Sequence, residues 1–525
     1  MGFTARTDDY LVPDRLLWQT LQERIANNFA CMPEKMASTK IAFFDSFDWR
    51  LYNKQLLLMR RHNTYELCLL HDESPIVAQP WPSGTCPIFW WDFHDTELAQ
   101  RLEKILDVRA LVLCLKLSRQ SQLLRILNRD EKTVLKVCLQ RNVQESTADD
   151  AHSIQLLKLT AIRGYDDFLE KFKIFLKTLQ LAPCTKHILE NISQGRARKP
   201  GDYSSKMYLH LKPEQTAKSA VVVIYNHLHD MMKQNEVGIK ADIDTEFLHD
   251  FRVAVRRTRS ALTQIQFVLP RQLTQEFKVR FAALGKATSR LRDLDVFLLR
   301  EKEYQAILPE ALRPGLAPMF RGLIRERRRE HKRLKAALES PEYETMLKEW
   351  LQAIRTLDTS SVNLECRNSD EPIANVSRQF IHKKYKQVLR VGKNLSSNSP
   401  DRDLHDLRIE CKKLRYLLEF FRSLYDESEM APLTRQLKQL QDNLGDFNDL
   451  GIQQANLKQM LDGVAPQSPN QTICAATIGG LIAVLHHRQR QLRMEFESTF
   501  AKFADRRNLA LYEKLFRSPL RKRTS

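Results

Sequence analysis

The stretch HDFRVAVRRTRSALTQI, residues 249–265, recurs without gaps as HDLRIECKKLRYLLEFF, residues 405–421. The positions that match in the two copies carry a histidine, an aspartate and four basic residues. The matched pairs are His249/His405, Asp250/Asp406, Arg252/Arg408, Arg256/Lys412, Arg257/Lys413 and Arg259/Arg415. A duplication of this kind indicates two related structural units in one chain.

Each copy has the spacing of an amphipathic helix. At about 100° per residue, the histidine and three basic residues of each copy fall within a sector of about 80°. These cationic stripes consist of His249, Arg252, Arg256 and Arg259 in the first copy and of His405, Arg408, Lys412 and Arg415 in the second. The apolar residues lie on the other side, as with Phe251, Val255 and Leu262 in the first copy. We therefore expect two helices that each bury one face and present a stripe of positive charge on the other.

A stripe of like charges is costly, because cations three and four residues apart repel each other by a few tenths of a kcal/mol per pair. A face needed only for solubility would intersperse glutamates, although a solvated basic face remains one reading of the pattern. Asp250 and Asp406 lie off the stripes and relieve little of the repulsion. The same stripe occurring twice favours a binding surface for a polyanion.

Each basic segment is followed by a second stretch with related sequence in the two halves of the region. The first is ALGKATSRLRDLDVFLL, residues 283–299, and the second is LQDNLGDFNDLGI, residues 440–452. Asp293 and Asp295, or Asp446 and Asp449, could hold a divalent ion, but pairing with the arginines or helix capping accounts for them more simply. Two other basic runs, RERRREHKRLK from Arg325 and HKKYKQVLR from His382, could line the same groove or form an outer face.

The two halves of the chain differ in pattern and in charge. From about residue 212, apolar residues recur every three or four positions, which predicts an all-helical region with breaks near residues 235–244, 308–315, 358–372, 396–403 and 463–471. Short alternating runs between residues 41 and 162 predict a mostly antiparallel sheet with helices at about 94–108 and 165–182. Residues 1–200 contain 28 basic and 24 acidic side chains, whereas residues 201–525 contain 55 and 40. Most of the net charge of +19 therefore belongs to the helical region.

The composition excludes several classes of protein. Only 15 glycines and 20 prolines occur in 525 residues, which is too few for a fibrous or disordered chain. No apolar run approaches the roughly 18 residues that a membrane span requires. The nine cysteines are scattered without a CxxC pair, which argues against a disulfide framework or a cysteine zinc site. Since the first residues show no secretory signal pattern, we expect a cytoplasmic protein.

The C-terminal region resembles the CHAD domain, a helical domain named for its histidines. The residues that carry the resemblance are LHDFRVAVRRTRSAL (248–262), LRDLDVFLL (291–299), LHDLRIECKKLRYLLEFF (404–421) and the segment around LQDNLGDFNDL (440–450). The resemblance implies an all-α domain of two four-helix bundles related by a pseudo-twofold axis, with a basic inner surface that binds inorganic polyphosphate. The candidate polyphosphate-binding residues are His249, Arg252, Arg256, Arg259, Lys286, Arg290, Arg292, His382, Lys386, His405, Arg408, Lys412 and Arg415. The resemblance to the CHAD domain also implies association with polyphosphate granules.

The N-terminal part is similar to a CYTH-type triphosphate tunnel domain, through FFDSFDWRLYNKQLLLMRR (43–61) and YELCLL (65–70). Enzymes of that family hydrolyse triphosphates in an antiparallel barrel, with paired carboxylates that hold Mg²⁺ or Mn²⁺. Here no ExExK strand occurs near the start, and Gln155 and Leu157 stand where carboxylates are expected. We therefore expect an α+β tunnel-like domain without catalytic residues, metal or cofactor, and Mg²⁺ or Mn²⁺ only if the domain is active. Arg60, Arg61 and Arg125 could still contact phosphate or be surface residues.

The expected domains follow from these boundaries. They are a CYTH-like domain at 1–195, a linker at 196–212, a first helical bundle at 213–358, a linker at 359–373, a second bundle at 374–510 and a basic tail at 511–525. The expected function is non-catalytic binding of polyphosphate, with no membrane span. The alternatives are a metal-dependent triphosphatase, a His-Asp metal phosphohydrolase, a nucleic-acid-binding protein, and a scaffold for an acidic protein. The stripes contain no aromatic residue on which bases could stack, which favours polyphosphate over nucleic acid.

Overall fold

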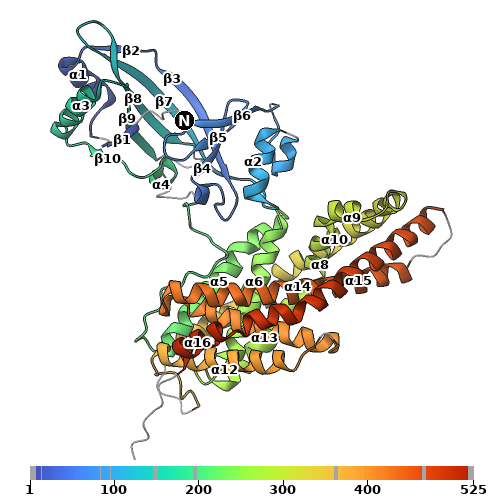
Figure 1. The fold of residues 1–525 in the computed structure, drawn as a ribbon. Helices are drawn as coiled ribbons and strands as arrows, with labels where there is room; N and C mark the ends of the chain where they lie inside the picture. Colours follow the sequence, from blue (N-terminus) through green and yellow to red (C-terminus); the bar gives the residue numbers. More distant parts are fainter. Residues whose placement is uncertain are drawn as a thin grey trace, which may run out of the picture. The chain divides into compact units, whose positions relative to one another are not determined.

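The computed structural model divides the chain into two compact units, Met1–Ser205 and Lys206–Ser525 (Figure 1). It describes residues 7–13, 15–82, 84–94, 96–145, 152–192, 198–359, 365–396, 398–463 and 469–517. Each unit has its own buried core of apolar side chains.

The N-terminal unit is built on a ten-stranded antiparallel sheet, which confirms the predicted α+β class. Nine strands lie in the order β10-β1-β9-β8-β7-β3-β4-β5-β6, and β2 pairs with β7. The strands are β1 (Thr7–Val12), β2 (Cys31–Pro33), β3 (Ala37–Asp45), β4 (Leu56–Arg61), β5 (Thr64–Leu69), β6 (Pro75–Pro80), β7 (Val112–Leu127), β8 (Thr133–Gln144), β9 (Ser153–Ala161) and β10 (Ala182–Pro183).

Strand β7 joins two segments that the sequence pattern separates. The apolar runs at 109–117 and 121–127 look like two strands, but β7 continues through both and pairs with β8 along most of its length. The intervening residues, Ser118 to Gln120, include neither glycine nor proline, so nothing in them forces a turn. The long strand carries Arg119 into the middle of the sheet.

Alternation along the strands gives the sheet two different faces. One face packs against helices α1 (Trp18–Asn28) and α3 (Asp166–Thr178) through a cluster that includes Leu124, Val137 and Phe172. The other face has an apolar end closed by α4 (Ile188–Ile192) and a polar middle around Arg119. Helix α2 (Glu97–Leu106) packs with the short helix η2 (Trp90–Phe93) over the outer side of β4 and β5. A last short helix, η1 (Tyr52–Lys54), precedes β4.

The C-terminal unit is all helical, as the spacing predicted. Within the described residues its helices are α5 (Ala217–Lys240), α6 (Thr245–Gln264), α7 (Arg271–Ala287), α8 (Ser289–Leu299), α9 (Glu301–Ile307), η3 (Glu310–Gly315), α10 (Leu316–Leu338), α11 (Pro341–Thr359), α12 (Ile373–Lys393), α13 (Asp401–Phe420), η4 (Arg422–Leu424), α14 (Glu427–Asp462), α15 (Pro469–Phe503) and α16 (Arg506–Phe516). The long helices α14 and α15 lie side by side (Figure 1). The α-helices outnumber the eight expected for two four-helix bundles, because short helices such as α8 and α9 interrupt the longer ones.

The two copies of the repeated segment form α6 and α13, and their predicted apolar faces are buried. Helix α6 begins after Asp244, whose carboxylate accepts hydrogen bonds from two backbone N–H groups of the first turn. The two helices contact each other directly. Arg257 of α6 donates to the Glu419 carboxylate of α13 at 2.8 Å, and Gln264 donates to the carbonyl of Lys413 at 3.0 Å.

The end of the chain differs from the expected basic tail. Helix α16 continues to Phe516, because Tyr512 and Phe516 are fully buried and hold this helix against the unit. The Tyr512 ring stacks on Tyr385 of α12 with 3.6 Å between ring centroids. The first residues of the expected tail are therefore helical, and residues 518–525 lie outside the described part. Of the helices that the structure describes, none combines the length and the apolar character needed to cross a membrane.

Candidate functional site: a cationic groove between the repeated helices

The two repeated helices line one groove of about 310 Å³ together with α8 and α14. Its basic side chains come from both copies of the repeat and from the segment at residues 283–299. They are His249, Arg252 and Arg256 of α6, Arg292 of α8, and Arg408 and Lys412 of α13. We call this site the cationic groove. Asp293 of α8 and Asn448 and Asp449 of α14 also line it.

Arg252 is fixed by the junction between α7 and α8. One guanidinium nitrogen donates to the carbonyl of Gly285 at 3.0 Å, the hydroxyl of Thr288 at 2.6 Å and the hydroxyl of Ser289 at 3.2 Å. These acceptors explain the small and polar residues of the segment GKATS, residues 285–289, which spans the junction of α7 and α8. Because they are all uncharged, Arg252 keeps its full positive charge in the groove.

The groove is electrostatically unfavourable for its own cations. Burial, together with the neighbouring Arg408 and Arg256, lowers the pKa of Lys412 to about 7. Burial and Arg256 lower the pKa of Arg252 to about 10. The Nε atoms of Arg256 and Arg408 are buried and have no hydrogen-bond partner among the described residues. A bound anion would accept these hydrogen bonds and relieve the repulsion.

Two carboxylates moderate the positive charge. Asp449 accepts a hydrogen bond from Arg408 at 3.0 Å and is half exposed. Burial raises the pKa of Asp293, while Arg252 and Arg290 oppose that shift. Asp295 points elsewhere and binds Arg327 of α10 at 2.7 Å. Asp449 and Asp295 therefore pair with arginines. This was the simpler of the two roles that the sequence allowed for these aspartates, the other being to bind a divalent ion.

The structure distributes the other candidate residues around the groove and away from it. His405 lies beside the groove, where its Nδ1 is 2.5 Å from the side-chain oxygen of Asn448. Arg290 is paired with Glu326 at 2.7 Å. His382 and Lys386 of α12 both contact Glu513 of α16, at 3.3 and 2.5 Å.

The last three candidates, Arg259, Lys286 and Arg415, also lie outside the groove lining. Arg259 and Lys286 are exposed. Arg415 lies 3.4 Å from Glu419, the carboxylate that Arg257 also binds. The helical period placed Arg259 and Arg415 on the basic faces, but it could not show which neighbouring helix covers each face.

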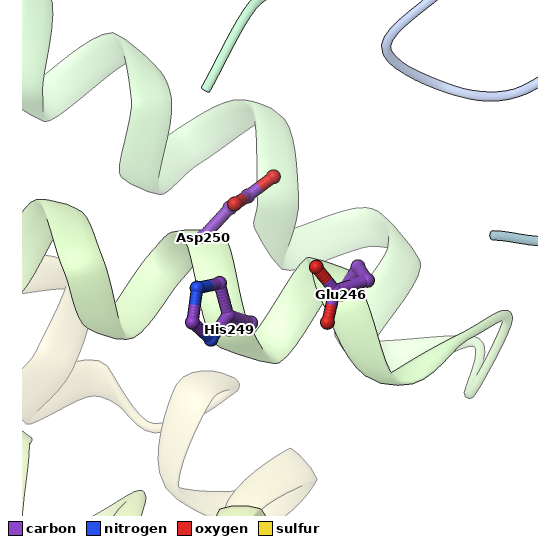
Figure 2. A group of neighbouring side chains, drawn as sticks. All are labelled: Glu246, His249 and Asp250. Atoms are coloured by element: carbon purple, nitrogen blue, oxygen red, sulfur yellow. The ribbon is translucent and has the colours of Figure 1, made fainter. Parts of the chain in front are cut away.

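One group of residues has the composition of a metal site. Glu246, His249 and Asp250 lie along the first turns of α6, with their possible ligand atoms within 4.8 Å of one another (Figure 2). All three residues already take part in other interactions. Arg292 lies 3.4 Å from Glu246, and its charge disfavours a cation there.

The polar middle of the N-terminal sheet centres on Glu73, which lies between β5 and β6. The Glu73 carboxylate accepts two hydrogen bonds from Arg119, at 2.7 and 3.0 Å, and one from Arg61 at 3.1 Å. Burial alone would raise its pKa, but Arg119, His187 and Lys158 outweigh that effect and hold the pKa well below 4.5. The interior cations of this unit therefore have a carboxylate of the protein as their partner.

The arginines proposed from the CYTH resemblance are also engaged. Arg61 binds Glu66 at 2.8 Å in addition to Glu73, and Arg125 lies 3.1 Å from Glu34. Arg60 contacts the sulfur of Cys86 at 3.1 Å. Gln155 and Leu157 lie on β9, where Leu157 packs into the cluster beneath α1 and α3 rather than toward the polar middle.

Parts of this chain are similar to a known family and to solved structures. The family model of the CHAD domain matches residues 223–458. The solved CHAD domain from the plant Ricinus communis is 24% identical and covers 58% of this chain and 98% of its own, with a TM-score of 0.48. PptA from Streptomyces chartreusis is 15% identical and covers 55% of this chain and 99% of its own, with a TM-score of 0.42. A Bacillus halodurans protein with an adenylate cyclase assignment is 14% identical and covers 36% of this chain and 97% of its own, with a TM-score of 0.24. No curated protein matches the chain.

Proposed function

We propose that this chain, in which residues 223–458 form a CHAD domain, binds inorganic polyphosphate in the cationic groove. The observation that carries the proposal is the convergence of Arg252, Arg256, Arg292, Arg408 and Lys412 on one groove. They come from three helices and from both copies of the repeat. Binding to polyphosphate granules would follow from the same interaction.

The groove chemistry suits a chain of closely spaced phosphates. Each guanidinium presents a planar set of donors that matches two phosphate oxygens, and each charge-assisted hydrogen bond is stronger than a neutral one. The unpartnered Nε atoms of Arg256 and Arg408 supply donors that no protein group satisfies within the described residues. Phosphate would also restore the charge of Lys412, which burial and its neighbours suppress.

Polyphosphate fits the groove better than nucleic acid does. Proteins that hold single strands stack bases on exposed aromatic rings. The aromatic residue of the groove lining is Phe297, and its side chain is only 3% exposed, so it belongs to the core. The groove lining can therefore bind phosphate groups but has no exposed aromatic ring on which a base could stack.

A triphosphatase is the rival function, and it would reside in the N-terminal unit. Such an enzyme needs carboxylates free to hold a divalent ion against phosphate. Glu73 is instead bound by Arg119 and Arg61. Phosphate release from tripolyphosphate by the full chain, dependent on Mg²⁺ or Mn²⁺, would establish the rival.

The test of the proposal is a titration with long-chain polyphosphate and with single-stranded DNA of matched charge, across a salt series. The wild-type chain should hold polyphosphate at salt concentrations that release DNA. Arg252→Glu combined with Arg408→Glu should abolish polyphosphate binding while circular dichroism shows unchanged helicity.

A matched control is Arg506→Glu with Arg507→Glu, two exposed arginines at the start of α16 that make the same change in charge. This control should retain binding. Equal loss in both double variants would show that only the net charge matters and would overturn the groove assignment.

A further inference from the structure

Helix α10 has a second cationic stripe, separate from the cationic groove. Five basic residues follow one another at steps of four, three, four and three positions. They are Arg321, Arg325, Arg328, Lys332 and Lys335, and all five are exposed. At about 100° and 1.5 Å per residue they share a sector of about 80° over a length of about 21 Å. We call these five residues the α10 stripe.

The other side of α10 is neutralised and packed. Its buried residues include Phe320, Leu323 and Leu334. Arg327 on this side binds Asp242 with both guanidinium nitrogens, at 2.8 and 2.6 Å, and binds Asp295 as well. The two acidic residues within the helix also avoid the stripe. Glu326 binds Arg290, and Glu330 binds Arg333.

The α10 stripe has no such compensation. Across the part of the chain that the structure describes, none of its five cations forms an ion pair. Four pairs within the stripe are like charges three or four residues apart, and each costs a few tenths of a kcal/mol. Acidic partners are present in α10 but all face the packed side, so the arrangement leaves one outward face with unbalanced charge.

We propose that the α10 stripe is a second polyphosphate-binding surface, which holds a further segment of a long chain already seated in the cationic groove. This inference rests on the proposed function. Helix α10 is joined to α8 by the Arg290–Glu326 and Arg327–Asp295 pairs, and α8 supplies Arg292 to the groove. The stripe faces away from α8, so a chain has to cross the width of one helix, about 10 Å, to reach it.

The second contact makes affinity depend on chain length. Once one segment is in the groove, binding of the next segment is intramolecular, and its effective concentration is high. A short anion such as tripolyphosphate cannot use both surfaces. The stripe has no aromatic side chain among its five members, so it lacks stacking platforms and is suited to phosphate alone.

The test compares tripolyphosphate with long-chain polyphosphate on the full chain. In the variant Arg325→Gln, Arg328→Gln, Lys332→Gln, affinity for long-chain polyphosphate should fall at least about tenfold and affinity for tripolyphosphate should stay unchanged. The control replaces Lys278, Lys393 and Lys502 by glutamine, three exposed lysines on α7, α12 and α15. It makes the same change in charge and should retain the preference for long chains. The stripe variant should also melt no lower than wild type, because it removes like-charge repulsion.

The outcomes separate this inference from the proposed function. Equal long-chain affinity in the stripe and control variants overturns the second surface and leaves the groove intact. An equal loss for single-stranded DNA and polyphosphate in the stripe variant also overturns it, since the surface would then be a general polyanion site. Unchanged tripolyphosphate affinity in Arg252→Glu/Arg408→Glu would instead contradict the groove.

Discussion

Lys412 is the residue whose charge state should respond most to ligand. It is surrounded by Arg256 of α6, Arg408 and Arg415 of α13, and Asp449 of α14. In the free protein the pKa of Lys412 is lowered from its ordinary value of 10.5 to about 7. The side chain is therefore largely uncharged above about pH 7. Bound phosphate favours the charged form.

Polyphosphate binding should therefore weaken as the pH rises above about 7, because each binding event must then supply a proton to Lys412. The expected loss is about tenfold or more, the value of one hydrogen bond to a charged group. Lys412→Arg keeps its charge throughout this range and should flatten the profile, as titration calorimetry between about pH 6 and 9 would show. Histidine titration is common to both proteins, so identical profiles would exclude Lys412 as the cause.

Glu73 has the opposite role, since it neutralises buried cations in the absence of ligand. Glu73→Gln leaves Arg119 buried without its charged partner and should lower the free energy of unfolding of the N-terminal unit by about 3–5 kcal/mol. Glu34→Gln, which removes the half-exposed partner of Arg125, should cost less than about 1 kcal/mol. Urea unfolding of both variants provides the comparison.

The pH dependence of the Glu73 effect follows from its lowered pKa. A carboxylate with a depressed pKa stabilises the folded state above its unfolded pKa and loses that contribution as the pH falls through its folded value. The difference between wild type and Glu73→Gln should thus be full above about pH 4.5 and shrink below it. A constant difference down to strongly acidic pH would show that packing, rather than charge, explains the cost.

At the scale of the element, close helix contacts depend on particular glycines. A Cβ added to Gly392 of α12 would lie 2.0 Å from the ring of Phe500 on α15. Gly392→Ala should therefore destabilise the C-terminal unit by about 1–3 kcal/mol through overpacking. Gly322 of α10 meets nothing within 4 Å.

Gly322→Ala is the control, and it should stabilise the protein by up to about 1 kcal/mol, because alanine is the better helix former. Thermal melts of the two variants should shift in opposite directions. A stabilising Gly392→Ala would mean that α12 and α15 can separate without cost.

Helical periodicity predicted the repeated helices well, because each helix buries one contiguous face and the spacing reports that face directly. The apolar residues that the pattern placed inside, such as Phe251 and Leu414, are buried, and Asp250 and Arg257 of α6 are buried as well. The pattern could not exclude Lys386 from the groove, because its pairing with Glu513 depends on where α16 docks. Glu73 was missed for a similar reason, since its partner Arg119 is distant in sequence and becomes adjacent only when the sheet forms.

At the scale of the whole molecule, the two units differ in net charge as well as in fold. Residues 206–525 carry 55 basic and 39 acidic side chains, whereas residues 1–205 carry 28 and 25. Among the described residues, the clusters around Leu124, Ile41 and Leu58 lie in the first unit and the cluster around Leu294 lies in the second. Both the cationic groove and the α10 stripe lie within the second unit.

Residues 206–525 should therefore fold alone and bind long-chain polyphosphate within about twofold of the full chain, as expected when both sites are built from residues of this unit. Circular dichroism would establish folding, and a titration at matched salt would compare the affinities. The reciprocal fragment, residues 1–205, should bind far more weakly, because Glu73 already occupies its interior cations. If the shorter fragment carried most of the affinity, the binding site would have to be assigned to the sheet domain, and Glu73→Gln would then be the variant expected to strengthen it.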